Sequence, residues 1–287
     1  MQRVDQLLRR ARELAPVSDS PRLDVELLLA WTLGKDRTWL YTWPEAELNA
    51  EQAVEFERAF SRRLKGVPLA HILGQREFWS LPLQVNNTTL IPRPDTERLV
   101  ELALSLTDGQ PEGKALDLGT GTGAIALAFA SERPGWKVAA VDASPEAVQL
   151  AERNRIQLGF AGVTCTQSDW FEGVNTAEPF DVILSNPPYI ADNDPHLNQG
   201  DVRFEPRSAL VAENEGLEDI QRIAQAAPEH LAAEGWLLLE HGWTQGETVR
   251  AILTARGFRN IRTEQDLGGN DRVTLGQAPA TGDRYDG

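Results

Sequence analysis

The residues with the clearest chemical potential are Asn186-Pro187-Pro188-Tyr189. The Asn186 side-chain oxygen and the Pro187 carbonyl are acceptors that can hold both hydrogens of a planar NH2 group. Two prolines fix this backbone in advance, so little ordering entropy is lost when a ligand binds. Tyr189 adds a flat face on which an amide or a base can stack. We therefore predict that these four residues are catalytic and bind the substrate, and that the reaction modifies an amide or amino nitrogen.

A glycine-rich stretch, Asp117-Leu118-Gly119-Thr120-Gly121-Thr122-Gly123, follows an apolar run and precedes a helical pattern. Glycines let a backbone turn tightly and approach a ligand closely. The spacing G-x-G-x-G differs from the dinucleotide fingerprint G-x-G-x-x-G, and the leading acid would repel a pyrophosphate. That acid can instead hold a cationic amino group, directly or through water. S-adenosyl-L-methionine, which carries an ammonium and a sulfonium, fits better than NAD. The predicted cofactor residues are Asp117, Gly119, Thr120, Gly121, Thr122 and Gly123.

Two further residues are candidates for the cofactor site. Asp142 ends the next apolar run, where an acid commonly binds both ribose hydroxyls of an adenosine. Its alternative role is that of an ordinary helix cap. Trp170 follows the third apolar run, where it either faces an adenine ring or fills the core. The only cysteine, Cys165, is expected to be buried filling rather than a nucleophile.

Strands and helices alternate after Gly113 and place these motifs at strand ends. Continuous apolar strands between amphipathic helices indicate a mostly parallel sheet covered on both faces. The expected strands are 115–118, 137–141, 163–166, 182–184, 236–239 and 273–275, with helices near 123–132, 144–158, 216–233 and 244–256. Residues 258–264 and 271–275 resemble a closing antiparallel pair.

The N-terminal part reads differently, as a small helical domain over residues 1–73. Apolar residues recur at helical spacing over 4–14, from Pro21 to Trp31, and from about Asn49 to Leu64. Residues 74–95 are expected to form a β-hairpin linker, with a turn at Asn86-Asn87. The catalytic domain is then 96–277, beginning with a helix over 97–106, and 278–287 is expected to be a disordered tail.

Composition and charge limit the classes of protein to which the chain can belong. The chain has 287 residues, 41% of them apolar and 25% charged, which is ordinary for a globular protein of two domains. One cysteine and four scattered histidines predict no disulfide and no metal. No secretory signal or membrane span is expected, so we predict a cytoplasmic location. Residues 1–75 carry zero net charge, and the remainder carries all of the −15. An acidic catalytic half disfavours a phosphate backbone.

These motifs resemble the HemK/PrmC family of protein-(glutamine-N5) methyltransferases. The matching pieces are 74–78, 91–97, the glycine stretch, Asn186 to Tyr189, 205–210 and 271–273. The resemblance implies a class I (Rossmann-like) methyltransferase domain joined by a hairpin to an N-terminal helical domain that recognises the substrate. It also implies that S-adenosyl-L-methionine is the methyl donor and that S-adenosyl-L-homocysteine is the product. Asn186 is implied to contact the cofactor as well as the target amide, and Trp170 to lie near the adenine. The implied substrate is the glutamine of the Gly-Gly-Gln motif in peptide-chain release factors, and its methylation would support translation termination. The enzyme is expected to act as a monomer and to bind no nucleic acid directly.

Several alternatives remain at this stage. The chain could instead be an N6-adenine methyltransferase, because adenine presents an NH2 group of the same geometry. Such an enzyme needs a basic groove for nucleic acid, which the acidic half of the chain lacks. Methylation of a ribosomal-protein glutamine is harder to exclude, and a non-enzymatic cofactor-binding regulator would not need Asn186 to Tyr189. Arg93 and Glu97 are included as substrate-binding candidates. They either line the substrate entrance or form an ion pair on one helical turn.

Overall fold

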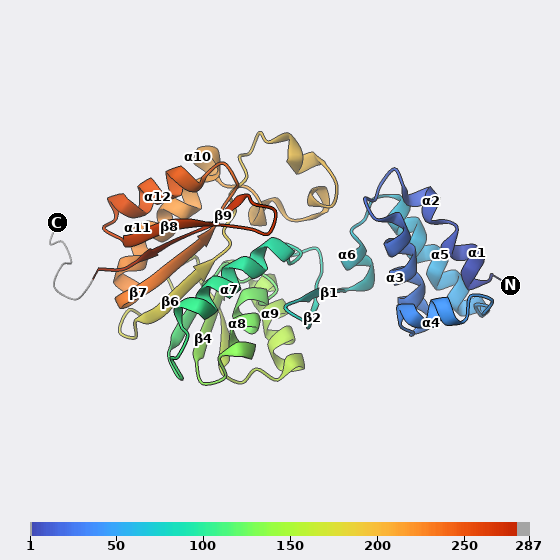
Figure 1. Cartoon of the computed structure of the whole chain (residues 1–287), viewed down its shortest axis with the longest axis horizontal. Coiled ribbons are helices and arrows are strands. Elements are labelled where there is room, and N and C mark those ends of the chain that lie inside the picture. The colour runs from blue at the N-terminus through green and yellow to red at the C-terminus, as the bar shows by residue number, and fades with distance from the viewer. Residues whose placement is uncertain (1, 280–287) are drawn as a thin grey trace. The chain divides into compact units, whose positions relative to one another are not determined.

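The computed structural model describes residues 2–279 and divides the chain into two compact units (Figure 1). The first comprises residues 2–75 together with 195–204, and the second comprises 76–194 and 205–279. The second unit contains both motifs that carry the predicted chemistry.

The first unit is helical, as predicted. Its helices are α1 (Val4–Leu8), α2 (Ala11–Leu14), α3 (Pro21–Leu33), α4 (Arg37–Thr42), α5 (Ala50–Leu64) and α6 (Leu69–Leu73), followed by the 3-10 helices η2 (Pro195–Asn198) and η3 (Val202–Phe204). The stacked rings of Phe56 and Phe60, 5.6 Å apart, lie in its core. Asn49 caps α5 by accepting from the Gln52 N–H. The expected helix over 4–14 is broken into α1 and α2, and α4 and α6 were not predicted because they are only six and five residues long.

Residues 195–204 are a difference from the predicted division, which placed them in the catalytic domain. They fold with the first unit because Arg63, 6% exposed, joins them to it. Its Nε lies 2.6 Å from Asp24 and its Nη1 lies 3.4 Å from Asp201. Arg203 adds a hydrogen bond to the Lys65 carbonyl. The first unit is therefore assembled from two separate stretches of the chain.

A β-hairpin opens the second unit, as expected, but its turn lies elsewhere. Strands β1 (Gln75–Phe78) and β2 (Leu81–Gln84) pair with each other. Trp79 and Ser80 connect them with φ values of 53° and 58°. Two residues at positive φ make the turn whose twist suits a two-residue hairpin. Sequence reasoning missed it because neither residue is the glycine or asparagine that usually marks such a turn.

The second unit is built on a seven-stranded sheet of order β5-β4-β3-β6-β7-β9-β8. Its strands are β3 (Lys114–Leu118), β4 (Lys137–Asp142), β5 (Val163–Gln167), β6 (Phe180–Ser185), β7 (Leu231–Glu240), β8 (Arg259–Gln265) and β9 (Asp271–Gln277). The first five are parallel, and β9 runs antiparallel to both β7 and β8. All the predicted strands are present, and the predicted closing antiparallel pair is confirmed.

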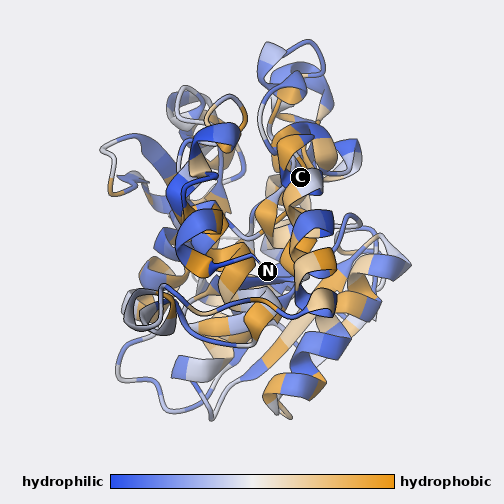
Figure 2. Ribbon diagram, turned by 90° about the vertical axis from the view of Figure 1, so that its right-hand side faces the viewer, coloured by the Kyte–Doolittle hydropathy of each residue, from blue (hydrophilic) through white to orange (hydrophobic). Residues whose placement is uncertain are grey.

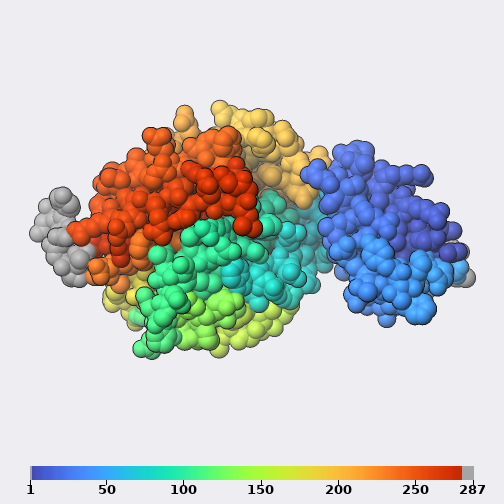
Figure 3. Space-filling model, in the orientation of Figure 1, coloured from blue at the N-terminus to red at the C-terminus, as the bar shows by residue number. Residues whose placement is uncertain are grey.

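Helices cover both faces of this sheet (Figure 1). The helices and 3-10 helices of this unit are η1 (Pro94–Thr96), α7 (Glu97–Leu106), α8 (Ala124–Glu132), α9 (Pro145–Leu158), η4 (Arg207–Ala209), α10 (Glu213–Gly216), α11 (Glu218–His230) and α12 (Gly246–Ala255). Helices α7 and α8 contribute to one apolar core, and α11 and α12 contribute to the other. Figure 3 shows the β8–β9 hairpin lying against the segment that contains α7. There Arg98 donates to the Gln265 carbonyl and pairs with Glu264.

Most helices contain both apolar and polar residues (Figure 2). No helix within residues 2–279 is both long and apolar enough to span a bilayer. The tail expected over 278–287 falls mostly on residues 280–287, outside the described residues. Ala278, also placed in that tail, is instead buried and donates to the Gly235 carbonyl.

Candidate active site

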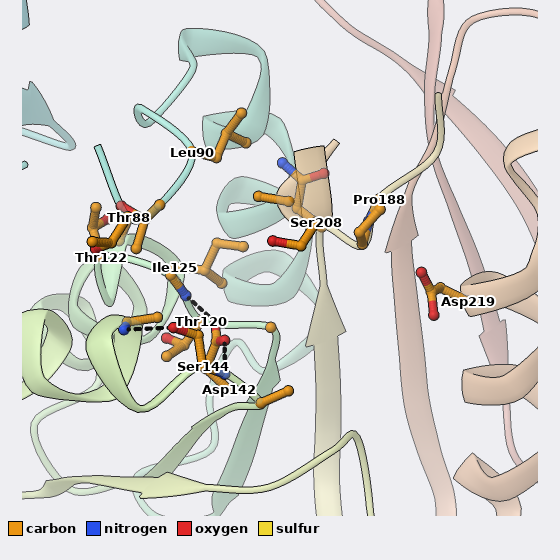
Figure 4. Close-up of a pocket in the computed structure, with 18 of the residues that line it drawn as sticks. Thr88, Leu90, Thr120, Thr122, Ile125, Asp142, Ser144, Pro188, Ser208 and Asp219 are labelled. Carbon is orange, nitrogen blue, oxygen red and sulfur yellow. Dashed lines mark hydrogen bonds between the residues drawn. The ribbon is translucent and has the colours of Figure 1, made fainter. Parts of the chain in front are cut away.

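A cavity of about 310 Å³ lies within the second unit, beside the carboxyl ends of β3, β4 and β6 (Figure 4). This is the edge where ligands bind in open α/β sheets. Its lining residues are Phe78, Thr88, Thr89, Leu90, Pro92, Arg93, Thr96, Gly119, Thr120, Gly121, Thr122, Ala124, Ile125, Asp142, Ala143, Ser144, Ala147, Ser168, Asp169, Trp170, Asn186, Pro188, Ser208, Ala209, Asp219 and Arg222. The glycine stretch and the asparagine motif therefore meet at one cavity.

The glycine stretch forms the turn from β3 into α8. Gly119, Gly121 and Gly123 have φ values of 70°, 55° and 84°, which non-glycine residues rarely adopt. A Cβ on Gly119 would lie 3.3 Å from the Trp170 ring, and one on Gly123 would lie 3.2 Å from Leu127. Thus Gly119 and Gly121 line the cavity, whereas Gly123 permits close packing of α8.

Asp142, at the end of β4, holds the glycine turn in place. Its carboxylate accepts from the N–H of Gly121 and of Ser144, both at 2.9 Å (Figure 4). Burial raises the pKa of this carboxyl, and those two hydrogen bonds oppose the increase. Each carboxylate oxygen accepts one of these bonds and retains further acceptor capacity toward the cavity. This position fits a ribose diol, and the helix cap at α9 comes from Ser144 instead.

Asp117 lies beneath the glycine turn rather than in the lining. It is fully buried, and its Oδ2 accepts from the Thr120 hydroxyl at 2.6 Å and from the Ala126 N–H at 3.2 Å. Burial raises its pKa to about 7. Its Oδ1 has no partner among the described residues, and neither does the buried hydroxyl of Thr89 in the cavity wall. Buried polar atoms seldom remain unpaired, so these two fit a bound polar ligand.

Trp170 lines the cavity beside Gly119. Its backbone has a φ of 46°, and its indole N–H donates to Asp219 at 3.2 Å. Burial raises the pKa of Asp219, which reaches the cavity from α11, opposite Asp142 (Figure 4). The indole and this carboxylate give the far end of the cavity an apolar surface and an acceptor, a combination suited to an adenine and its amino group.

Asn186 follows β6 and faces the cavity. Its Nδ2 donates to the Thr96 hydroxyl at 3.1 Å. The nitrogen end of the amide is thus directed to Thr96. The side-chain oxygen is left as the acceptor for a ligand.

The other three residues of the motif have different positions. Pro188 lines the cavity, Pro187 is buried, and Tyr189 packs against the core beneath α11 and α12. Gln245 donates to the Tyr189 carbonyl at 3.1 Å, and Ile190 pairs with Leu210 and Ala212. Burial raises the pKa of Tyr189 further above its ordinary value. The segment is thus fixed on both sides, but the ring of Tyr189 is not part of the cavity wall.

Arg93 and Glu97 do not pair with each other. Arg93 lines the cavity and pairs with Glu205 at 2.6 Å, whose carboxylate also accepts from the Ile91 N–H. Glu97 accepts from the Trp79 N–H at 2.9 Å and supports the hairpin turn. Arg93 therefore lines the cavity, whereas Glu97, which was also expected to bind the substrate, does not.

Sequence reasoning missed several lining residues. Thr88 and Thr89 come from the loop after the hairpin, Ser208 and Ala209 from η4, and Asp219 from α11. The stretch 205–210 gave a signal, because it belongs to the pattern shared with the HemK/PrmC family. No sequence signal marked Asp219 as a cavity residue. An acid in the first turn of a helix usually indicates only a favourable interaction with the helix dipole.

Comparison with known proteins agrees with this geometry. A family model described as the PrmC N-terminal domain matches residues 6–74, and one described as the methyltransferase small domain matches 98–203. A release factor glutamine methyltransferase of Shewanella oneidensis is 54% identical over 92% of this chain and 92% of its own. One of Pseudomonas aeruginosa is 56% identical over 91% of this chain and 94% of its own. The crystal structure of a methyltransferase from Pyrococcus furiosus, 19% identical, covers 78% of this chain and 99% of its own with a TM-score of 0.54, which shows the fold alone.

Proposed function

The chain belongs to the HemK/PrmC family of release factor glutamine methyltransferases, and from this premise we propose that it methylates the side-chain amide nitrogen of a release-factor glutamine. The observation that carries the proposal is the orientation of Asn186 at the cavity. With its Nδ2 directed to Thr96, its oxygen is the acceptor that meets an NH2 group. The relatives' names supply the substrate class, and the geometry accounts for how such a substrate is held.

The residues on the glycine side of the cavity fit S-adenosyl-L-methionine as the cofactor. Asp142 would bind the ribose hydroxyls, and Trp170 with Asp219 would contact the adenine. The unpaired Oδ1 of Asp117 suits the cationic amino group. When bound, this cofactor supplies an activated methyl group on a cationic sulfur, which leaves readily and so requires no strong base.

The residues on the asparagine side would orient the target amide. An amide nitrogen is a weak nucleophile because its lone pair is delocalised into the carbonyl. Two acceptors, Asn186 Oδ1 and the Pro187 carbonyl, hold both N–H hydrogens and fix the nitrogen toward the methyl group. Positioning of this kind lowers the barrier by removing the entropy of orientation. Arg93, tied to Glu205, lies at the same side and would contact the neighbouring substrate backbone.

Mass spectrometry of a release factor incubated with the protein and S-adenosyl-L-methionine tests this proposal. One methyl group, about 14 Da, should appear on the glutamine of the Gly-Gly-Gln motif, as expected for CH3 replacing H on a positioned nitrogen. A release factor with that glutamine replaced by glutamate lacks the NH2 and serves as the matched control substrate. Ribosomal protein and adenine-containing nucleic acid are supplied in parallel. Label on either of these, with the release factor unmodified, would reverse the assignment.

A further inference from the structure

A buried carboxyl group lies beside the base of the asparagine motif. Glu240 is the last residue of β7 and is 1% exposed. Strands β6 and β7 run parallel with Ser185 paired to Leu239, so Glu240 and Asn186 are the next residues along their strands. Neither the reaction proposed above nor the cofactor site accounts for an ionisable group at this position, where burial without an ion pair is unfavourable.

The surroundings of Glu240 link it to Asn186 and Thr96. Asn186 and Thr96 lie near its carboxyl and lower its pKa as donors, and Thr96 accepts from Asn186 Nδ2 at 3.1 Å. Glu240 Oε2 itself has no hydrogen-bond partner among residues 2–279. Within the same residues, no arginine or lysine nitrogen lies within 4 Å of the carboxylate. The buried carboxylate thus lies beside two polar side chains of the cavity wall and has no ion pair within residues 2–279.

We propose that Glu240 is a positioning residue: its carboxylate holds the NH2 end of the Asn186 side chain, so that Oδ1 remains directed to the substrate amide. This inference rests on the function proposed above. The two ends of an asparagine amide have nearly the same shape, so only their partners decide which end faces the substrate. An ionised carboxylate can only accept, and it therefore rejects the oxygen end.

The ionised form is required for this selection. Burial raises the pKa of Glu240 to about 7, an effect to which Asp95 adds and which hydrogen bonds from Thr96 and Asn186 and the charge of Arg272 oppose. The charged or titratable groups facing it are thus Arg272 from β9, Asp95 from η1 and Tyr189 after β6. A protonated Glu240 carries a donor and accepts either end of the amide. Selection is therefore lost as the pH falls below about 7 and complete above it.

The first test needs no substrate. In the full-length protein, the ¹⁵N signal of the Asn186 side-chain NH2, assigned by its absence in Asn186→Ala, should shift with pH with a midpoint near 7. Glu240→Gln should abolish this titration. Asp181→Asn is the matched control, because Asp181 lies near the opposite end of β6 and accepts from the Lys114 N–H. A signal that does not titrate in the unmodified protein, or that still titrates in Glu240→Gln, overturns the proposal.

The second test measures turnover. Glu240→Gln should lower kcat by about 10- to 100-fold, the range seen when an outer partner that orients a ligating side chain is removed. The melting temperature and the cofactor Kd should remain unchanged, and the rise of kcat between pH 6 and 8 should disappear. Thr96→Val, which removes the other partner of Asn186 Nδ2, should lower kcat without altering cofactor binding. A merely structural role predicts parallel losses of kcat, cofactor affinity and melting temperature, and that outcome counts against positioning.

The two tests separate this inference from the substrate assignment. If the unmodified protein fails to methylate a release factor, the function proposed above is wrong, whereas the NMR titration still decides the relation between Glu240 and Asn186. If the release factor is methylated and Glu240→Gln keeps the full rate at every pH, the function stands and the positioning role is wrong.

Discussion

The two sides of the cavity are held together by contacts of very different range along the chain. On the cofactor side, Asp142 accepts from Gly121 and Ser144, residues in the turns that follow two adjacent strands. On the substrate side, Asn186 donates to Thr96, which is 90 residues away, and the Glu205 carboxylate reaches Ile91 across 114 residues. The proposed ribose contact therefore depends on the neighbouring strands β3 and β4, whereas the acceptor side depends on segments that lie far apart in the sequence. Binding and turnover should respond separately to substitution.

Asn186→Ala should produce the largest effect. Removing the acceptor acts on the oriented amide more than on the bound cofactor, and loss of one such group in other enzymes lowers kcat by about 10²–10³. Single-turnover methylation assays should show this loss, while calorimetry shows the cofactor Kd unchanged. A large decrease in cofactor affinity would mean that the two sides are not separable.

Asp142→Ala should show the opposite pattern. Each hydrogen bond to a charged group contributes about 1.5–3 kcal/mol, so the cofactor Kd should rise roughly 10- to 150-fold for one lost bond. At saturating cofactor, kcat should recover most of its original value, because the acceptor side is intact. Asp142→Asn keeps one acceptor oxygen and is the matched variant, with a smaller increase in Kd. Unrecoverable turnover in Asp142→Ala would contradict the comparison.

The smallest expected effect concerns pH and the cofactor side alone. The pKa of Asp117 is raised to about 7 in the folded protein, so its contribution to stability is present below its unfolded pKa and lost as the pH rises through 7. A cationic ligand favours the ionised form, and its binding should release a proton. The association constant of S-adenosyl-L-methionine should then rise roughly eightfold from pH 6 to 7.5, as follows from a single group of pKa near 7.

Calorimetry at the two pH values checks this prediction. Asp117→Asn should remove the pH dependence, and Glu240→Gln, on the other side of the cavity, should leave it intact. If Glu240→Gln removes it instead, the titration belongs to the substrate side, and the assignment of Asp117 to the cofactor is wrong.

The sequence predicted the strands along the chain and both motifs better than it predicted the other residues that line the cavity. The glycine stretch and Asp142 are local signals, since their chemistry and position follow from one strand end each. Glu240 could not be recognised, because its significance depends on the pairing of β6 with β7, which no local pattern reveals. Glu97 was misjudged for the same reason: its partner, Trp79, lies in a hairpin turn that carries no glycine or asparagine. Contacts between residues far apart in the sequence are therefore the part of the site that the sequence alone could not predict.

The composition of the helical unit from two stretches has a consequence for synthesis on the ribosome. Its first stretch ends at residue 75 and its second ends at residue 204, which is 129 residues later (204 − 75). At about 5–20 residues per second, roughly 6–26 s separate the two. During that interval Arg63 has been synthesised but Asp201 has not, and β3, β4, β5 and β6 are made in between. The helical unit is the first to be translated, yet it is completed only after four of the seven strands of the main sheet exist.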